Sequence, residues 1–375
     1  MRRWGSSVPE SRLGVGIVGV SPVRGWAATA HIPALRALPN YEIRALTAHS
    51  AESARAAGEA FGVPAVFHDY EQMLARPDID VVTVTVRVPH HRELVCAALA
   101  AGKAVYCEWP LGRDLEEART MAALAVQQRV RTVVGLQARQ APAIEFVQQL
   151  LGEGYVGEVL STTMVGVSVP GDVVVRANAY MLDETNGANV LTIALGHSLD
   201  TLSYVLGEFA DLSAVSALRR PLITIEETRE QIVKTGADQV AVIGTLTSGA
   251  TASLHIREAV AGGTGFLWEI NGTDGTIRIT ADAAYPEIFP LTVWGGQGRN
   301  EPVELPTPPA MTQKWPALSS MEATPAHNVG RVYAAFAQDI EDATHTVPDF
   351  ADAVRRHELI AAIERSAASG QRVSV

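Results

Sequence analysis

Apolar runs and amphipathic segments alternate along the first 137 residues. Residues 12–20 (RLGVGIVGV) form a short, β-branched apolar run that ends in glycine, which is typical of a buried strand. In the segment that follows, Ala30, Leu35 and Leu38 have the spacing of one helical face. The alternation continues through a nearly continuous apolar strand at 81–88 (VVTVTVRV). It predicts an α/β domain with a doubly wound parallel sheet over residues 13–137.

The pattern changes near residue 138. A helix is expected at 141–154 (APAIEFVQQLLGEG), and Thr- and Val-rich segments follow it. In 240–258 and 266–280 apolar and polar positions alternate, with glycine-rich turns between the segments. This period of two indicates antiparallel strands with one covered face. We predict a second, α+β domain over residues 138–375 with a large, mainly antiparallel open sheet, whose C-terminal helix can pack back on the first domain.

Composition narrows the class of protein. The 375 residues suit two domains, and the 47% of hydrophobic residues are typical of a well-buried globular chain. A net charge of −11 argues against nucleic acid or an anionic membrane as a partner. We interpret residues 1–12 as a disordered lead-in and not a signal peptide. Cys96 and Cys107 lie in apolar surroundings, which fits buried thiols and a cytoplasmic protein.

The loop after the first strand has the composition of a phosphate-binding site. Gly19 and Gly25 lie between the strand and the helix, where glycines let the backbone approach a pyrophosphate and the helix N-terminus offers free N–H groups. The spacing departs from G-x-G-x-x-G because a longer loop separates the two glycines, so a plain strand-to-helix turn is an equal alternative on this evidence alone. The residues predicted to line the dinucleotide here are Gly19, Ser21, Gly25, Trp26 and Ala27.

Several motifs in fixed order resemble a known family. They are GIVGV (16–20) with HIPAL (31–35), DIDVV (78–82), the long run 91–111 that ends in CEWPL, and EINGTDGTIRI (269–279). Together they resemble the glucose–fructose oxidoreductase / inositol dehydrogenase / MocA family over nearly the whole chain. The longer glycine loop and EWPLG are similar to the branch that contains the fungal galactose-pathway repressor. The resemblance implies a Rossmann domain, a nicotinamide cofactor, a sugar-like substrate, and an open sheet that makes a homodimer or homotetramer.

The turn after the second strand bears on the choice of cofactor. An acid there binds the ribose hydroxyls of NAD and repels the 2′-phosphate of NADP. The stretch LTAHSAES (46–53) has no acid at the turn, where Ala48, His49 and Ser50 stand. His49 and Ser50 can both donate to a phosphate, so we favour NADP over NAD, with His49 as a plain turn residue the alternative. The predicted cofactor-binding set is completed by Arg87, His91, Glu108, Trp109 and Pro110.

Candidate catalytic residues follow from the resemblance. The family places its catalytic histidine at the position of His197, which shares a helical face with Asp200. Family enzymes that act on sugar carbons carry Glu-Lys-Pro where this chain has Glu108-Trp109-Pro110, and an Asp where it has Ile193. Trp109 can donate one N–H and offer a flat face, but it cannot carry a proton. The predicted substrate-binding residues are Trp109, Tyr180, Asn189 and His197.

Two functions stay open on this evidence. In the first, which we favour, the protein is an NAD(P)-dependent oxidoreductase acting on a sugar, cyclitol, glycoside or similar molecule, with His197 handling the proton. In the second, it binds the dinucleotide without chemistry and works as a sensor or co-regulator. A metal-dependent hydrolase is a weaker third alternative, because no His, Cys or Asp cluster has ligand spacing. No metal ligand is predicted.

Overall fold

A computed structural model describes residues 12–168, 171–258 and 263–375, so nearly all of the expected lead-in lies outside the described residues. The chain divides into two compact units. The first unit comprises Met1–Gln137 with Trp315–Val354, and the second comprises Ala138–Lys314 with Arg355–Val375. The sequence assigned Trp315–Val354 to the second domain, whereas its contacts place it in the first unit.

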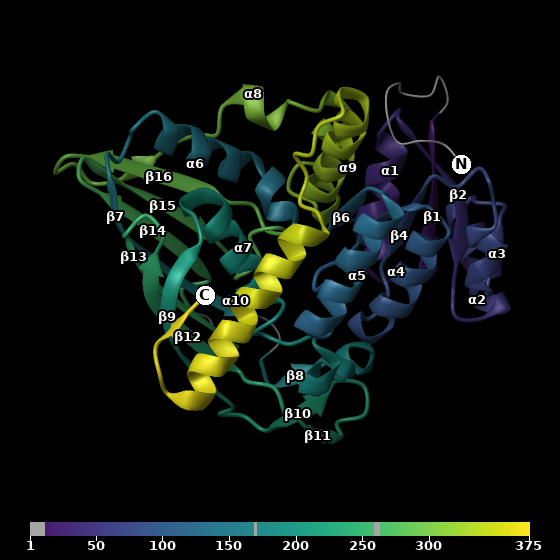
Figure 1. The fold of residues 1–375 in the computed structure, drawn as a ribbon, viewed down its shortest axis with the longest axis horizontal. Helices are drawn as coiled ribbons and strands as arrows, with labels where there is room; N and C mark the ends of the chain where they lie inside the picture. The colour runs from purple at the N-terminus through teal and green to yellow at the C-terminus, as the bar shows by residue number, and fades with distance from the viewer. Residues whose placement is uncertain (1–11, 169–170, 259–262) are drawn as a thin grey trace. The chain divides into compact units, whose positions relative to one another are not determined.

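The first unit is built on a six-stranded sheet in the order β3-β2-β1-β4-β5-β6, with every pair parallel (Figure 1). The order reverses between β1 and β4, and ligands of doubly wound sheets bind at such a point, beyond the carboxyl ends of the strands. The strands are β1 Leu13–Val18, β2 Tyr41–Thr47, β3 Val66–Phe67, β4 Val81–Val84, β5 Ala104–Cys107 and β6 Thr132–Val134. This is the Rossmann arrangement that the sequence predicted.

Helices connect these strands, and several begin at residues that the sequence marks. Asp114 caps α5, because its side chain accepts a hydrogen bond from Glu117 N at 2.9 Å. Ala30, Leu35 and Leu38 are all buried, as predicted, but only Ala30 and Leu35 are helical, because α1 ends at Ala37 and Leu38 has extended backbone. The helical segments are η1 Ala27–His31, α1 Ile32–Ala37, α2 Ala51–Phe61, α3 Tyr70–Leu74, η2 Val88–His90, α4 His91–Ala100, α5 Leu115–Gln128 and η3 Gln137–Gln140.

Helix α9 (Pro325–Asp342) returns from the C-terminal part of the sequence and packs against η1 and α1. Val329, Tyr333 and Phe336 share one hydrophobic core with residues of β1 and α1. Burial of this apolar face stabilises the first unit, at about 25 cal/mol for each Å² removed from water. An element far along the sequence therefore completes the Rossmann unit.

The second unit contains a nine-stranded sheet in the order β17-β16-β15-β14-β7-β13-β12-β9-β18. Only β7 and β13 pair in parallel, so the sheet is mainly antiparallel, as predicted. Its strands are β7 Val159–Ser168, β9 Phe209–Ala217, β12 Gln239–Leu246, β13 Thr251–Glu258, β14 Phe266–Gly272, β15 Gly275–Ala281, β16 Thr292–Gln297, β17 Val303–Glu304 and β18 Val373–Ser374. A small second sheet consists of β8 Val173–Val174, β10 Leu222–Ile225 and β11 Gln231–Val233.

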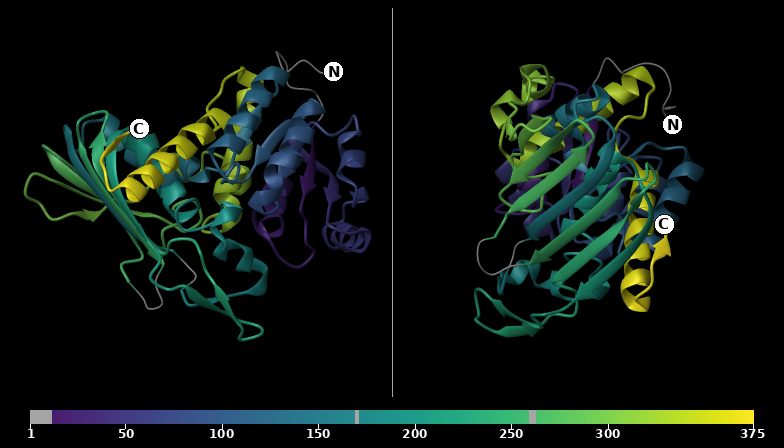
Figure 2. Two further views of the ribbon diagram at one scale, coloured as in Figure 1. Left: turned by 60° about the horizontal axis from the view of Figure 1, so that its bottom comes forward. Right: turned by 90° about the vertical axis from the view of Figure 1, so that its left-hand side faces the viewer.

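The two faces of the large sheet differ. Helices α6 (Pro142–Gly152) and α7 (Ala194–Leu206) lie on one face (Figure 1), whereas the strands of the other face are uncovered in the right-hand view of Figure 2. On the uncovered face Val215 is 65% and Ile243 60% exposed. The Pro-rich loop does not cover them, because its helix α8 (Pro309–Thr312) contacts α6.

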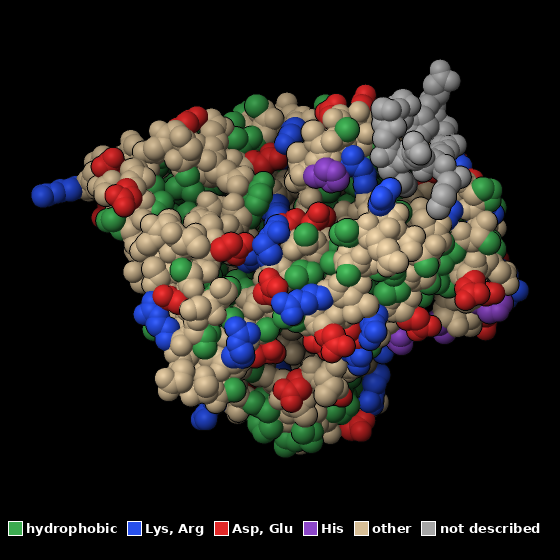
Figure 3. Space-filling model, viewed as in Figure 1, with side chains coloured by type: hydrophobic (Ala, Val, Ile, Leu, Met, Phe, Trp, Pro, Cys, Tyr) green, Lys and Arg blue, Asp and Glu red, His purple; other side chains and the backbone are tan. Residues whose placement is uncertain are grey.

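Charged side chains of both signs stand on the surface. On the face drawn in Figure 3, acidic and basic side chains are interspersed. Within the described part of the chain, no helix is both long and apolar enough to cross a membrane. Cys96 and Cys107 are both free thiols, and Cys107 is buried.

Candidate functional site: a glycine loop and a small cavity

Gly19 directly follows β1 and has a φ of 90°, a conformation that favours glycine. Its N–H donates to the carbonyl of Thr47 at 3.1 Å, which ties the loop to the end of β2. A Cβ at Gly19 would lie 2.6 Å from Cγ1 of Val86, which is too close for an unstrained contact. Glycine is therefore required here so that the loop can pack against the end of β4.

Gly25 has a φ of 95°, but for a different reason. A Cβ there would meet nothing within 4 Å, so the loop leaves open space beside this residue just before the first helical turn. Such space beside a glycine and a helix start fits a dinucleotide pyrophosphate. Ser21 and Trp26 are both half-buried, and Ala27 is buried. The Trp26 side chain packs against the core, and its Nε1 is buried without a hydrogen-bond partner among the described residues.

Ala48, His49 and Ser50, in the turn after β2, differ in exposure and in their contacts. Ala48 is only 7% exposed, whereas His49 is exposed. Ser50 caps α2, because its Oγ accepts a hydrogen bond from Ser53 N at 3.1 Å. Glu52, the nearest acid after the turn, lies in the first turn of α2. His49 is therefore the predicted phosphate donor that remains at the surface.

Glu108, at the carboxyl end of β5, is held by the protein. His31 Nε2 lies 2.9 Å from Glu108 Oε1, and Gln137 Nε2 donates to both carboxylate oxygens at 3.2 and 3.0 Å. A Cβ at Gly135 would lie 2.7 Å from Glu108 Oε2, so glycine makes room for the carboxylate. The side chain of Glu108 keeps 15% exposure. The sequence singled out Glu108 and contained His31 in the HIPAL motif, but it missed the contacts of His31, Gln137 and Gly135 with Glu108, because these residues are brought together only by folding.

The two residues that follow Glu108 lie in a loop that is tied to the end of β4 through His91. The Trp109–Pro110 peptide is cis, and Trp109 is 6% exposed. His91 is buried, with Nδ1 2.9 Å from the Pro110 carbonyl and Nε2 3.0 Å from the Val86 carbonyl, and burial lowers its pKa. The imidazole of His91 therefore ties the Pro110 loop to the end of β4. Arg87 is exposed and precedes η2.

In the second unit, His197 lies in the first turn of α7 and is 6% exposed. Burial lowers its pKa to about 3, so the imidazole is neutral at physiological pH. His197 Nε2 lies 3.5 Å from Oε1 of Glu287, which is also buried. His197 Nδ1 has no hydrogen-bond partner among the described residues. A neutral imidazole with an unoccupied ring nitrogen can accept a proton.

Asp200 does not act together with His197. Its carboxylate accepts two hydrogen bonds from Arg139, at 2.9 and 2.6 Å, and it is 1% exposed. Such two-bond pairs fix geometry strongly, and removal of one partner leaves a buried charge without compensation. Asp200 is therefore committed to an ion pair that joins α7 to the segment before α6.

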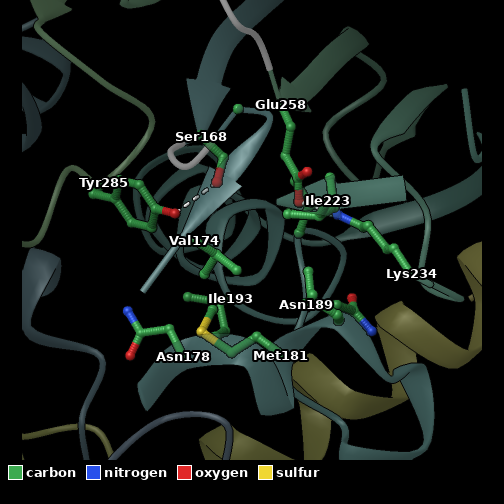
Figure 4. Close-up of a pocket in the computed structure, with 13 residues that line it drawn as sticks. Ser168, Val174, Asn178, Met181, Asn189, Ile193, Ile223, Lys234, Glu258 and Tyr285 are labelled. Atoms are coloured by element: carbon green, nitrogen blue, oxygen red, sulfur yellow. Dashed lines mark hydrogen bonds and ion pairs between the residues drawn. The ribbon is translucent and has the colours of Figure 1, made fainter. Parts of the chain in front are cut away.

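A small cavity with both polar and apolar lining residues lies near the start of α7 (Figure 4). Its water-accessible volume is about 30 Å³, enough for one or two waters. Two polar pairs line it: Ser168 Oγ lies 2.6 Å from the Tyr285 hydroxyl, and Lys234 forms an ion pair with Glu258. Burial raises the pKa of Glu258, and the hydrogen bond from Lys234 opposes that rise. The cavity offers hydrogen bonds to a small polar group.

Of the predicted substrate-binding residues, some line this cavity and others do not. Asn189 lines it, together with Ile193, the position for which the resemblance implied an aspartate. Tyr180 and His197 are not among its lining residues; the carbonyl of Tyr180 accepts a hydrogen bond from Asn186 at 2.7 Å. The sequence missed Ser168, Lys234, Glu258 and Tyr285, because they come from separate strands and loops of the second unit. Among the described residues no group of three His, Cys, Asp or Glu side chains has metal-binding geometry.

The fold and the glycine loop define a two-domain protein with a nicotinamide-dinucleotide-binding Rossmann unit. A family described as "Oxidoreductase family, NAD-binding Rossmann fold" matches residues 13–136, and one described as "Gal80p, C-terminal domain" matches residues 142–281. The chain belongs to the glucose–fructose oxidoreductase / inositol dehydrogenase / MocA family, in its Gal80-like branch.

Three relatives illustrate the range of the family. The chain is 31% identical to dehydrogenase aclE of Aspergillus oryzae, over 96% of this chain and 98% of that protein. It is 26% identical to the galactose/lactose metabolism regulatory protein GAL80 of Saccharomyces cerevisiae, over 77% of this chain and 72% of that protein. It is 27% identical to levoglucosan dehydrogenase of Pseudarthrobacter phenanthrenivorans, over 71% of this chain and 73% of that protein.

Solved structures show the same fold. A super-repressor mutant of Gal80p from Saccharomyces cerevisiae superimposes with a TM-score of 0.85 at 22% identity, covering 97% of this chain and 98% of that one. Levoglucosan dehydrogenase in complex with NADH and levoglucosan superimposes with a TM-score of 0.81 at 22% identity, covering 97% of this chain and all of that one (100%). At these identities the likeness concerns the fold alone.

Proposed function

We propose that the protein is an NAD(P)-dependent oxidoreductase that interconverts a hydroxyl and a carbonyl group on a sugar, cyclitol, glycoside or similar molecule. The observation that carries the proposal is the glycine loop of the first unit, where Gly25 leaves open space at the start of the first helical turn. The 31% identity to a dehydrogenase over 96% of the chain supports it. A bound nicotinamide supplies or accepts the hydride.

The residues of the chain then have to bind, orient and handle one proton. Gly19, Ser21 and Gly25 would hold the pyrophosphate, and His49 the 2′-phosphate of NADP, which we favour because no acid stands at the end of β2. His197 is the proposed proton acceptor. Its lowered pKa keeps it neutral, which suits oxidation of a hydroxyl better than reduction of a carbonyl.

A second candidate function is a non-catalytic dinucleotide-binding regulator. Two observations favour it: the match of residues 142–281 to the Gal80p C-terminal domain, and the presence of Trp109 and Ile193 where family enzymes carry Lys and Asp. Neither Trp109 nor Ile193 can exchange a proton, so the site lacks two proton-handling groups that the family enzymes have.

Two further expectations belong to the proposal. We infer a homodimer or homotetramer formed through the uncovered face of the large sheet, where Val215 and Ile243 are exposed. We also infer a cytoplasmic location, because both cysteines are free thiols.

One experiment separates the two functions. The whole chain is titrated calorimetrically with NAD⁺, NADH, NADP⁺ and NADPH, and sugars, cyclitols and glycosides are then screened for absorbance change at the nicotinamide band. Binding with turnover supports the oxidoreductase, and binding without turnover of any compound supports the regulator. Failure of all four dinucleotides to bind contradicts both. Trp109→Lys restores the proton-handling group, so new activity in this variant of an otherwise inactive protein would also support the regulator.

A further inference from the structure

A chain of hydrogen bonds runs through the first unit to the carboxylate of Glu108. Thr83 Oγ1 lies 2.8 Å from the hydroxyl of Tyr333, and that hydroxyl lies 2.9 Å from His31 Nδ1. The other ring nitrogen, His31 Nε2, lies 2.9 Å from Glu108 Oε1. Thr83, Tyr333 and His31 are each 0% exposed, so the chain has no outlet to solvent at its inner end. It can position groups, but it cannot carry protons to bulk water.

These bonds can be directed so that every group in the chain of hydrogen bonds is satisfied. Burial raises the pKa of Tyr333 well above its ordinary value, so the phenol keeps its proton and can donate to His31 Nδ1. In that arrangement the Thr83 hydroxyl donates to the phenol oxygen and His31 Nε2–H donates to Glu108, so every donor and acceptor is used. The carboxylate of Glu108 is then the acceptor at the outer end of the chain.

Glu108 is also fixed in place from its other side. Gln137 donates to both carboxylate oxygens, and Gly135 provides the space that the carboxylate occupies. The next residue is Trp109, where the oxidoreductases of the family carry a lysine. The Trp109 side chain carries no charge, and the Glu108 carboxylate keeps 15% exposure at the carboxyl end of β5.

We propose that Glu108, oriented by His31, Tyr333 and Gln137, makes the dinucleotide site prefer the oxidised nicotinamide to the reduced one. The oxidised ring carries a positive charge and the reduced ring is neutral, so a nearby partly buried carboxylate stabilises only the oxidised form. The inference rests on the proposed dinucleotide site in this unit. It makes Tyr333, on α9, a positioning residue of that site.

The test measures dissociation constants of both redox forms by calorimetry on the whole chain, using NADP⁺ with NADPH and NAD⁺ with NADH. Glu108→Gln removes the charge and keeps the shape. Its amide can donate to His31 Nε2, after which His31 Nδ1–H donates to Tyr333 and Tyr333 to Thr83, so every group stays satisfied. We expect the preference for the oxidised form to fall roughly tenfold, which corresponds to about 1.4 kcal/mol, with the melting temperature little changed.

Two more variants test the same idea independently. Trp109→Lys adds a positive charge next to the carboxylate and should lower the oxidised preference in the same direction. Tyr333→Phe removes the donor to His31 Nδ1 and should lower it by a smaller factor. The matched control is Tyr41→Phe, because Tyr41 is another buried tyrosine of this core whose hydroxyl donates to the carbonyl of Tyr333, outside the chain that reaches Glu108.

The outcomes separate this inference from the proposed function. A folded Glu108→Gln variant that binds both forms with an unchanged ratio overturns the inference alone. A surface control, Glu42→Gln, should leave the ratio unchanged, since Glu42 lies on β2 and is 51% exposed. An equal change in this control would show a general charge effect and overturn the role given to Glu108. If no dinucleotide binds the unmodified chain, both the proposed function and the inference fail.

Discussion

The Nε2 atom of His197 lies 3.5 Å from Oε1 of Glu287, and both side chains are buried inside the second unit. Burial lowers the pKa of His197 to about 3, so the resting imidazole is neutral at physiological pH. Glu287 is the acidic side chain that faces its Nε2, and the two form a buried polar pair that includes the first turn of α7.

The first prediction concerns turnover. In a compound screen that yields activity, His197→Ala should lower kcat by roughly 10²–10⁴, the usual range for a lost general acid–base group. The variant should still bind dinucleotide, because His197 lies outside the first unit. Steady-state kinetics on the purified variant check this. Turnover that survives the substitution unchanged would remove His197 from the mechanism.

The second prediction concerns stability as a function of pH. The pKa of His197 is about 3 in the folded protein, against an ordinary value of 6.5, so below pH 6.5 the unfolded chain binds a proton that the folded chain does not. Stability should therefore fall as the pH drops from about 6.5 toward 3, by at most about 1.4 kcal/mol per pH unit for this one group. His327, whose pKa burial lowers to about 4, acts in the same direction.

The measurement compares thermal unfolding of the unmodified chain and His197→Gln between pH 4 and pH 7.5. Glutamine does not titrate, so the variant should lose less stability over this range. Parallel curves for the two proteins would contradict the low pKa assigned to His197.

The third prediction concerns Gly25. Gly25→Val places a side chain in the open space beside the loop and should weaken dinucleotide binding while the protein stays folded. Its backbone conformation also disfavours a side chain, at a cost on the order of 1–3 kcal/mol. The matched control is Gly62→Val at the end of α2, which likewise has a positive φ and open space around its Cβ. Both variants should lose stability, but only Gly25→Val should lose affinity in calorimetry. Equal dinucleotide affinity in the two variants would contradict the placement of Gly25 beside the dinucleotide.

The fourth prediction concerns cofactor choice. Ala48 is buried and His49 is exposed, so a carboxylate can be introduced at position 49 without being buried. His49→Asp should shift the preference from NADP toward NAD, because the carboxylate repels the 2′-phosphate and accepts bonds from the ribose hydroxyls. His345→Asp, at an exposed position after α9, controls for net charge. If the unmodified chain binds NADH much more tightly than NADPH, the interpretation of this turn is wrong.

The fifth prediction concerns assembly. The uncovered face of the large sheet should pair with another copy, giving a dimer or tetramer mass in light scattering at micromolar concentration. Ile243→Asp places a charge on this face and should reduce the mass to that of a monomer. The control is Val126→Asp, on α5 of the first unit, where Val126 is 78% exposed. A monomeric mass for the unmodified chain would contradict the assembly.

The sequence alone predicted the two sheets, because hydrophobic periodicity and turn residues are local signals. The run LGVGIV became a strand buried at every position, and the alternation at 266–280 became β14 and β15. The same local chemistry placed Gly19 and Glu108 at strand ends of the parallel sheet and Gly25 in the loop before the first helix. The resemblance to the family, which needs only the order of residues, drew attention to Trp109 and Ile193.

Only the tertiary structure decided which side chains meet. His31 and Tyr333 are hydrogen-bonded although they are 302 residues apart in the sequence. They meet because α9, near the C-terminus, packs against η1, near the N-terminus. Asp200 is committed to Arg139, which no helical spacing could show. The cavity between the Ser168–Tyr285 and Lys234–Glu258 pairs likewise exists only once separate strands are brought together. Periodicity reports which face of an element is apolar, whereas polar partners depend on packing between elements that are distant in sequence.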